Sequence, residues 1–171
     1  MKGYGSSLAG SGGHLYAGGL FTTAGGSAAT NIAKWNGSSW SALGSGMNER
    51  VLALAVSGSN VYAGGYFTTA GGSAAYYIAK WNGSSWTALG SGIGGGSPYG
   101  PYVSAVAVSG SDVYAGGGFT TAGGSAATNI AKWNGSSWSA LGSGLSGGGV
   151  SALAVAGSDL YAGGGFTSAG G

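Results

Sequence analysis

Short hydrophobic runs separated by glycine- and serine-rich turns recur along the whole chain. The run 51–56, Val-Leu-Ala-Leu-Ala-Val, is apolar on both alternating sides, which is typical of a strand buried on both faces. Together with the runs that follow it, this stretch predicts four strands, at 51–56, 61–65, 76–81 and 86–89. Asn82-Gly83 predicts a hairpin loop before the last strand, because both residues tolerate a positive φ. No segment has a helical period, so the pattern predicts an all-β protein.

The same pattern is repeated almost without change. Residues 21–46 and 119–144 are identical, and 67–92 differs from them only at Tyr76, Tyr77 and Thr87. The tripeptide Tyr-Ala-Gly recurs in steps of 46, 52 and 47 residues, a period that indicates stacked supersecondary units. Four short antiparallel strands in each unit predict the blade of a β-propeller. Such close copies indicate either recent amplification of one repeat or consensus construction.

The repeat resembles the kelch family. The features that carry the resemblance are the Tyr-Ala-Gly-Gly end of the second strand at 62–65, Trp81 in the third strand, and Trp86 followed by Leu89 in the fourth. It looks closest to the kelch-like repeats of large bacterial surface proteins and of the fungal cortical polarity-marker family. The resemblance covers nearly the whole chain and implies a propeller of four-stranded antiparallel blades. It also implies an extracellular or cell-surface location, although no signal peptide is recognisable at residues 1–7.

The repeat boundaries predict a single propeller segment over 1–171. Its blades are expected at 5–46, 51–92 and 103–144, with a half blade at 150–171. This amounts to three and a half blades, or fourteen strands. The first strand of the first blade is eroded, since Gly5 and Gly10 stand where the second blade has Val51 and Val56.

The half blade carries the main functional hypothesis, a structural or interaction module that associates with itself. Its second strand lacks outer partners, so we expect an open assembly edge at Leu160, Tyr161, Gly163 and Gly164. The expected partner is another copy of the chain, met through its eroded first blade at 5–19. Such contacts build a dimer, a closed ring or a head-to-tail polymer. A segment cut from a longer repeat array would have the same sequence.

Composition argues against several other partners. Only eight of the 171 residues are charged and the net charge is +2, which is too sparse for tracking nucleic acid phosphates. One lysine per repeat, at Lys34, Lys80 and Lys132, is expected to be solvated. No stretch approaches the roughly 18 apolar residues of a membrane span. There is no cysteine, so no disulfide or thiolate site is expected.

Candidate catalytic residues are scarce. The acids are Glu49, Asp112 and Asp159, and the last two occupy equivalent turn positions, where they are expected to act as turn formers. His14 is the only histidine and stands at the same turn position in the first repeat. No carboxylate pair or metal-ligand spacing is present, so the sequence predicts a non-enzyme without catalytic, cofactor or metal site.

Ligand recognition remains as a second hypothesis. The links between blades are where the copies differ, and their candidate ligand-face residues are Glu49, Arg50, Tyr99 and Tyr102. The six tryptophans are expected to pack between blades, or alternatively to form sugar-stacking platforms. The alternative function is therefore a carbohydrate-binding propeller lectin with repeated shallow sites. An ice-binding surface is disfavoured, because the paired threonines occur once per blade and form no flat ladder.

Overall fold

In a computed structural model the described residues, 2–96 and 100–170, form strands and turns and no helix. The strands are arranged in several small antiparallel sheets, and none of these sheets closes on itself within the described residues. The all-β prediction is confirmed. Three of the sheets contain four main strands each, which neighbour one another in the order of the chain. A fourth sheet, formed by the last repeat, contains two main strands.

The main strands follow the repeats. The first sheet contains β1 (Lys2–Ser11), β2 (His14–Ala24), β4 (Ile32–Trp35) and β5 (Trp40–Ala42), with β3 (Ser27–Ala28) paired to β2. The second contains β6 (Val51–Ser57), β7 (Asn60–Gly65), β10 (Ile78–Trp81) and β11 (Trp86–Ala88). The third contains β13 (Tyr102–Ser109), β14 (Asp112–Gly118), β17 (Ile130–Trp133) and β18 (Trp138–Ala140). The fourth contains only β20 (Val150–Ala156) and β21 (Asp159–Gly164).

Short strands fill the connections between these sheets. Their bounds are β8 (Thr69–Ala70) with β9 (Ser73–Ala74), β12 (Ile93–Gly94) with β15 (Thr121–Ala122) and β16 (Ser125–Ala126), and β19 (Leu145–Ser146) with β22 (Ser168–Ala169). The connection between the second and third strands of the second repeat thus contains a small hairpin of its own, formed by β8 and β9. The third strand of the second repeat begins at Ile78 and not at Tyr76, because Tyr77 has a positive φ of 66° that ends the extended backbone.

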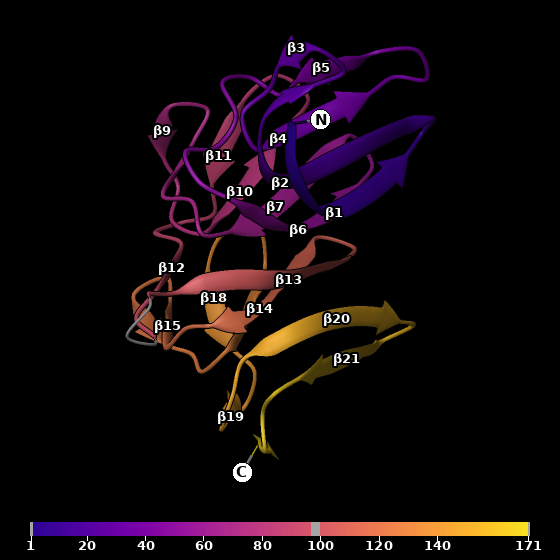
Figure 1. The fold of residues 1–171 in the computed structure, drawn as a ribbon. Coiled ribbons are helices and arrows are strands. Elements are labelled where there is room, and N and C mark those ends of the chain that lie inside the picture. Colours follow the sequence, from indigo (N-terminus) through magenta and orange to yellow (C-terminus); the bar gives the residue numbers. More distant parts are fainter. Residues whose placement is uncertain (1, 97–99, 171) are drawn as a thin grey trace.

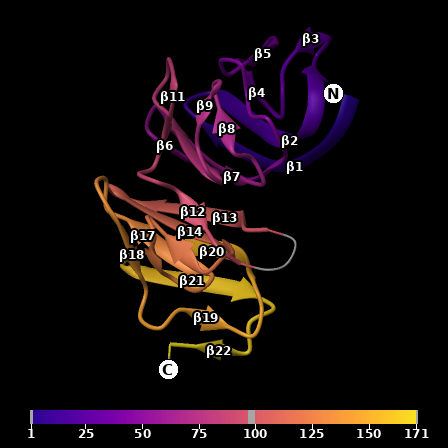
Figure 2. The same ribbon diagram turned by 90° about the vertical axis from the view of Figure 1, so that its left-hand side faces the viewer.

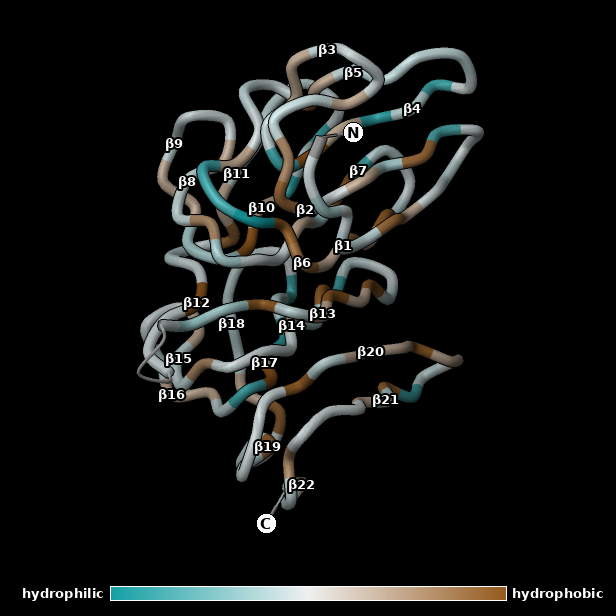
Figure 3. The backbone as a smooth tube through the Cα atoms, in the orientation of Figure 1, coloured by the Kyte–Doolittle hydropathy of each residue, from teal (hydrophilic) through white to brown (hydrophobic). Residues whose placement is uncertain are grey.

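The four sheets follow one another along the molecule. Strands β1, β6, β13 and β20 lie side by side in this order, and the two chain ends lie at opposite ends of the row (Figure 1). The view turned by 90° shows the same succession, with the first sheet at the top and β19 and β22 at the bottom (Figure 2). Hydrophobic segments recur along these strands (Figure 3). Buried clusters form at each junction, and the one between the third and fourth sheets contains fewer fully buried residues.

A valine set against a glycine spaces each sheet from the next. A methyl group added at Gly18 of β2 would lie 2.5 Å from Val51 Cγ1, the first residue of the next sheet. The same holds at Gly64, 2.5 Å from Val103 Cγ1, and at Gly116, 2.6 Å from the Cγ1 atom of Val150. Because real side chains do not approach so closely, only glycine at these positions permits the observed sheet spacing.

Tryptophan pairs join the outer halves of neighbouring sheets. In the second sheet the rings of Trp81 and Trp86 lie 5.4 Å apart between centroids, tilted by 51°. The Trp86 Nε1–H donates to the carbonyl oxygen of Leu43 in the preceding sheet, at 2.9 Å. In the third sheet Trp138 repeats this bond to the Leu89 oxygen, at 2.7 Å. Tryptophans therefore pack between sheets, as expected, at the junction of the first and second sheets and at that of the second and third.

An asparagine with positive φ braces the outer half of the first and third sheets. Asn31, at φ 64°, accepts a hydrogen bond from the Phe21 N–H at 3.1 Å and donates through Nδ2 to the Met47 oxygen at 2.9 Å. Asn129 makes the equivalent bonds in the third sheet. The second sheet has Tyr77 at this position, with the same backbone conformation but without a side-chain amide. Asparagine tolerates this region better than tyrosine does.

Replacing Tyr77 with asparagine is therefore expected to stabilise the protein. The change restores a brace that the other two copies show to fit, and we expect the free energy of unfolding to rise by about 1–2 kcal/mol. Chemical denaturation followed by circular dichroism measures it. Tyr76→Thr, the neighbouring and exposed difference between the copies, serves as the control and should change stability by less than about 0.5 kcal/mol. A Tyr77→Asn protein no more stable than the parent would contradict this account.

Candidate functional site

The outer face of the last sheet is open. A methyl group added at Gly163 would meet no atom within 4 Å, in contrast to its equivalents in the three preceding sheets. Tyr161, on the same strand face, is 58% exposed, whereas its equivalents Tyr16 and Tyr62 are 6% and 7% exposed. This face has the shape and composition of the covered faces inside the molecule.

The four residues expected at the assembly edge do not share one surface. Side chains alternate along a strand, so Tyr161 and Gly163 belong to the open face, while Leu160 is half-buried against the third sheet. Gly164 closely approaches the backbone of Gly149 on its other side. The last sheet thus presents two separate surfaces, an open face and the open edge of β21.

The opposite end of the row is open as well. Leu8 of β1 is 67% exposed, although its equivalent Leu54 in the second sheet is 8% exposed. The glycines expected to erode this strand do not shorten it, since β1 has ten residues and nine of them pair with β2. Gly5 pairs with Gly19 as Val51 pairs with Gly65, so what the first strand lacks is the valine side chain.

The candidate ligand-face residue Tyr102 lines a hollow between the second and third sheets. Its ring lies against Gly118, where a methyl group would come 2.5 Å from Tyr102 Cε1. The Tyr66 ring lies 5.4 Å from that of Tyr102 between centroids, tilted by 41°. The two tyrosines border a cavity of about 510 Å³ that Thr120 and Thr128 also line.

Glu49 lines an equivalent hollow in the first sheet. This cavity, of about 490 Å³, is bordered by Tyr4, Thr22 and Thr30. These residues are the equivalents of Tyr102, Thr120 and Thr128 in the third sheet. Arg50 is not available in the same way, because its Nε and Nη2 atoms donate to the Ser6 hydroxyl at 3.0 and 2.8 Å. Tyr99 lies outside the described residues. Of the candidates that the structure describes, Glu49 accepts a hydrogen bond through Oε1 from the Arg50 backbone N–H at 2.9 Å, whereas Tyr102 lines a different hollow from Glu49.

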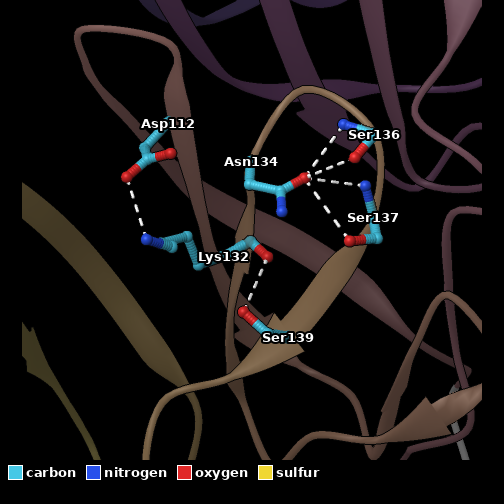
Figure 4. Close-up of polar contacts among 6 residues, drawn as sticks. All are labelled: Asp112, Lys132, Asn134, Ser136, Ser137 and Ser139. Carbon is cyan, nitrogen blue, oxygen red and sulfur yellow. Dashed lines mark hydrogen bonds and ion pairs between the residues drawn. The ribbon is translucent and has the colours of Figure 1, made fainter.

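One ion pair joins charged groups on the third sheet. Lys132 Nζ lies 2.9 Å from Asp112 Oδ2, and both side chains are partly exposed (Figure 4). The hydrogen bond to the Asp112 carboxylate, reinforced by its charge, raises the pKa of Lys132 above the usual value. In the adjoining loop Asn134 Oδ1 accepts hydrogen bonds from the backbone N–H groups and hydroxyls of Ser136 and Ser137 (Figure 4). Asp112 thus pairs with a lysine in addition to standing at a turn.

Other chemical features are limited. No group of three or more metal-ligating residues lies together in the described part of the chain. His14 begins β2, and its buried Nδ1 has no hydrogen-bond partner among the described residues. None of the described segments is a helix long and apolar enough to cross a membrane.

Neither the family models nor the curated proteins give a match to the chain. What the chain does is therefore inferred from the geometry of its repeats.

Sequence reasoning missed the residues that border the edge of β21. They are Ile130, Leu141, Leu145, Ala162 and Phe166, which line a groove of about 350 Å³ beside that strand. The signal available in the sequence was position within the repeat: Phe166 is the fourth member of a series formed by Phe21, Phe67 and Phe119. Comparing equivalent positions one by one would have indicated a site filled in some copies and open in the last.

Proposed function

We propose that this chain is a non-enzymatic interaction module that associates with further copies of itself through the two ends of its row of sheets. The observation that carries the proposal is the open glycine at Gly163. In each of the three preceding sheets the equivalent glycine is covered by the first valine of the next sheet. An uncovered face of this kind leaves Tyr161 in water and favours burial against another surface.

The first sheet of a second copy supplies a matching surface. Inside the molecule Leu54 Cδ1 lies 3.4 Å from a methyl group placed at Gly18, and Leu153 Cδ1 lies 3.2 Å from one at Gly116. The exposed Leu8 is the equivalent leucine of the first sheet. We expect Leu8 of a second copy to cover Gly163 in the same way. Because Gly5 stands where the other sheets have a valine, Leu8 is the side chain that contacts Gly163.

We further infer that the four-stranded sheets are blades of a kelch-like β-propeller. In support, β1, β6, β13 and β20 adjoin one another, while β5, β11 and β18 lie at the far edge of their sheets. Propellers have about four to eight blades. Three four-stranded sheets and one pair of strands are fewer, so we expect a closed ring to combine more than one chain. A head-to-tail contact whose rotation does not close builds a fibre instead. From the kelch resemblance we expect such an assembly at the cell surface or outside the cell.

Replacing Gly163 with lysine is expected to abolish the assembly. The new side chain would put a charge into the surface that Leu8 covers, at a position where the single chain has open space. Light scattering at micromolar concentration should give a mass above that of one chain for the parent and the mass of one chain for the variant. A stable single-chain mass for the parent protein would overturn the proposal.

Ser158→Lys is the matched control, because it adds the same charge to the same hairpin. Its equivalent Ser59 stays exposed although the second sheet is covered on both faces, so the assembly should persist. The chain's low charge gives little repulsion between copies. Loss of the assembly in both variants would mean that added charge alone disperses it.

A second candidate is glycan binding at the hollows beside Tyr102 and Tyr4. The tilted pair of Tyr66 and Tyr102 offers ring surface beside threonine hydroxyls, a combination suited to the apolar face and hydroxyls of a sugar. The hollow of the first sheet offers a single tyrosine, Tyr4, beside Thr22 and Thr30, which fits repeated shallow sites. Retention on a glycan array by a protein with single-chain mass would favour this candidate over self-association.

A further inference from the structure

The edge of β21 is a surface distinct from the open face that the self-association proposal uses. In the first three sheets the second strand pairs with a third strand: β2 with β4, β7 with β10, and β14 with β17. Among the described residues β21 pairs only with β20. The fourth sheet therefore has the inner pair of strands and an unpaired edge where the other sheets carry their outer pair.

The other copies show which backbone groups beside the second strand bind the third strand. Gly19, Gly65 and Gly117 donate their N–H groups to the oxygens of Asn31, Tyr77 and Asn129, at 3.0 to 3.1 Å. Gly164 is the fourth member of this glycine series. Likewise the N–H groups of Phe21 and Phe119 donate to an asparagine Oδ1, and Phe166 is their equivalent.

The apolar part of the site is equally defined. Leu43 and Leu89 are buried under the tryptophan pair of the next sheet, and their carbonyl oxygens accept the indole N–H bonds. The next member, Leu141, is only half-buried. It borders the groove of about 350 Å³ formed with Ile130, Leu160, Ala162 and Phe166.

A glycine series marks where the indole rings would lie. A methyl group at Gly44 would be 3.4 Å from Trp81 Cζ3, and one at Gly90 would be 3.0 Å from Trp133 Cζ3. At Gly142, the equivalent in the third sheet, nothing lies within 4 Å. The backbone groups of Gly164 and Phe166, the Leu141 oxygen and the open space at Gly142 thus all fit the same element, an outer strand pair with two tryptophans.

We propose that the β21 edge is a receptor site for a β-hairpin of this same repeat, supplied by another polypeptide. The hairpin is one of the type Asn-Ile-Ala-Lys-Trp, a tight Asn-Gly loop, and Trp-Ser-Ala-Leu, as in residues 129–141. It adds a strand to β21 by backbone pairing, which is a common way of recognising an extended segment.

Each element of the hairpin has a defined place. Its asparagine braces the backbone of Phe166, as Asn129 braces Phe119. Its two tryptophans fill the groove, and the second donates its indole N–H to the Leu141 oxygen. Its lysine meets Asp159, the equivalent of the Asp112 that pairs with Lys132 at 2.9 Å. The third sheet makes all of these contacts at once, which shows that they are compatible with one another.

The test uses a synthetic peptide with the sequence of residues 125–144 and a fluorescent label at its N-terminus, titrated with the protein. Fluorescence anisotropy should show saturable binding to Gly163→Lys, which keeps the face contact out of the measurement. The Trp138→Ala peptide should bind at least about tenfold more weakly, because it loses the ring and its hydrogen bond. The Ser139→Thr peptide, a change that the second copy already carries as Thr87, should bind as the parent does.

A second protein tests the same site in case the free peptide is too poorly folded to bind well. The chain extended directly after residue 171 by the same twenty residues should unfold at a higher temperature than the parent and should no longer bind the peptide. Absence of peptide binding together with an extension that adds no stability overturns the proposal. Such an outcome with an intact assembly of the parent protein would overturn the edge site alone and leave self-association through the face standing.

Discussion

Replacing Trp86 with alanine is expected to lower the free energy of unfolding by about 3–5 kcal/mol. The ring is buried between the first and second sheets, and its Nε1–H is bonded to the Leu43 oxygen. The substitution leaves a cavity and an unpaired carbonyl group at the same place. Denaturant unfolding followed by far-ultraviolet circular dichroism measures the loss without depending on tryptophan emission.

Trp40→Ala is the matched control for this prediction. Trp40 is the equivalent residue of the first sheet, which no other sheet precedes among the described residues, and it is half-exposed. Its replacement should cost about 1–2 kcal/mol, since less apolar surface is lost. Trp138→Ala should match Trp86→Ala, because its indole bond to Leu89 is the same. Equal effects at Trp40 and Trp86 would show that contacts within a sheet, and not the junction, dominate the stability.

Replacing Gly64 with alanine is expected to destabilise the protein by about 1–3 kcal/mol. The added methyl group would lie 2.5 Å from Val103 Cγ1 and 3.0 Å from Val106 Cγ2, so the second and third sheets would have to move apart. The backbone conformation at Gly64 is open to any residue, so the cost comes from the contact between sheets and not from the dihedral angle. Chemical denaturation of the purified variant gives the value.

A double substitution identifies the contact responsible. Val103→Ala alone leaves a cavity, but together with Gly64→Ala it removes the clash, so the double variant should lose less stability than the two single losses added together. Gly163→Ala, at the open end, should be neutral or slightly stabilising in the single chain. Strict additivity of the two substitutions would contradict the spacing role assigned to Gly64 and Val103.

Much of the local structure could be predicted because it depends on neighbours in the chain. The Asn-Gly loops after Trp35, Trp81 and Trp133 form as expected, since in each loop the asparagine Oδ1 accepts hydrogen bonds from the backbone N–H groups of the two serines that follow the glycine. The strand order within each repeat also follows from short turns between apolar runs. The copies therefore predict one another's strands, and the half sheet at the end was predicted in the same way.

The tertiary structure decided which of these equivalent residues are buried. Leu43 and Leu141 stand in identical sequence, yet only Leu43 is fully covered, because a complete sheet follows the first sheet and only a pair of strands follows the third. Leu160 and Tyr161 are adjacent in sequence, but the alternation of side chains along β21 places them on opposite faces. The hollow beside Tyr102 likewise depends on Tyr66, which comes from the preceding repeat. Local sequence determines where a strand forms, whereas the burial of its side chains depends on the surface that packs against it.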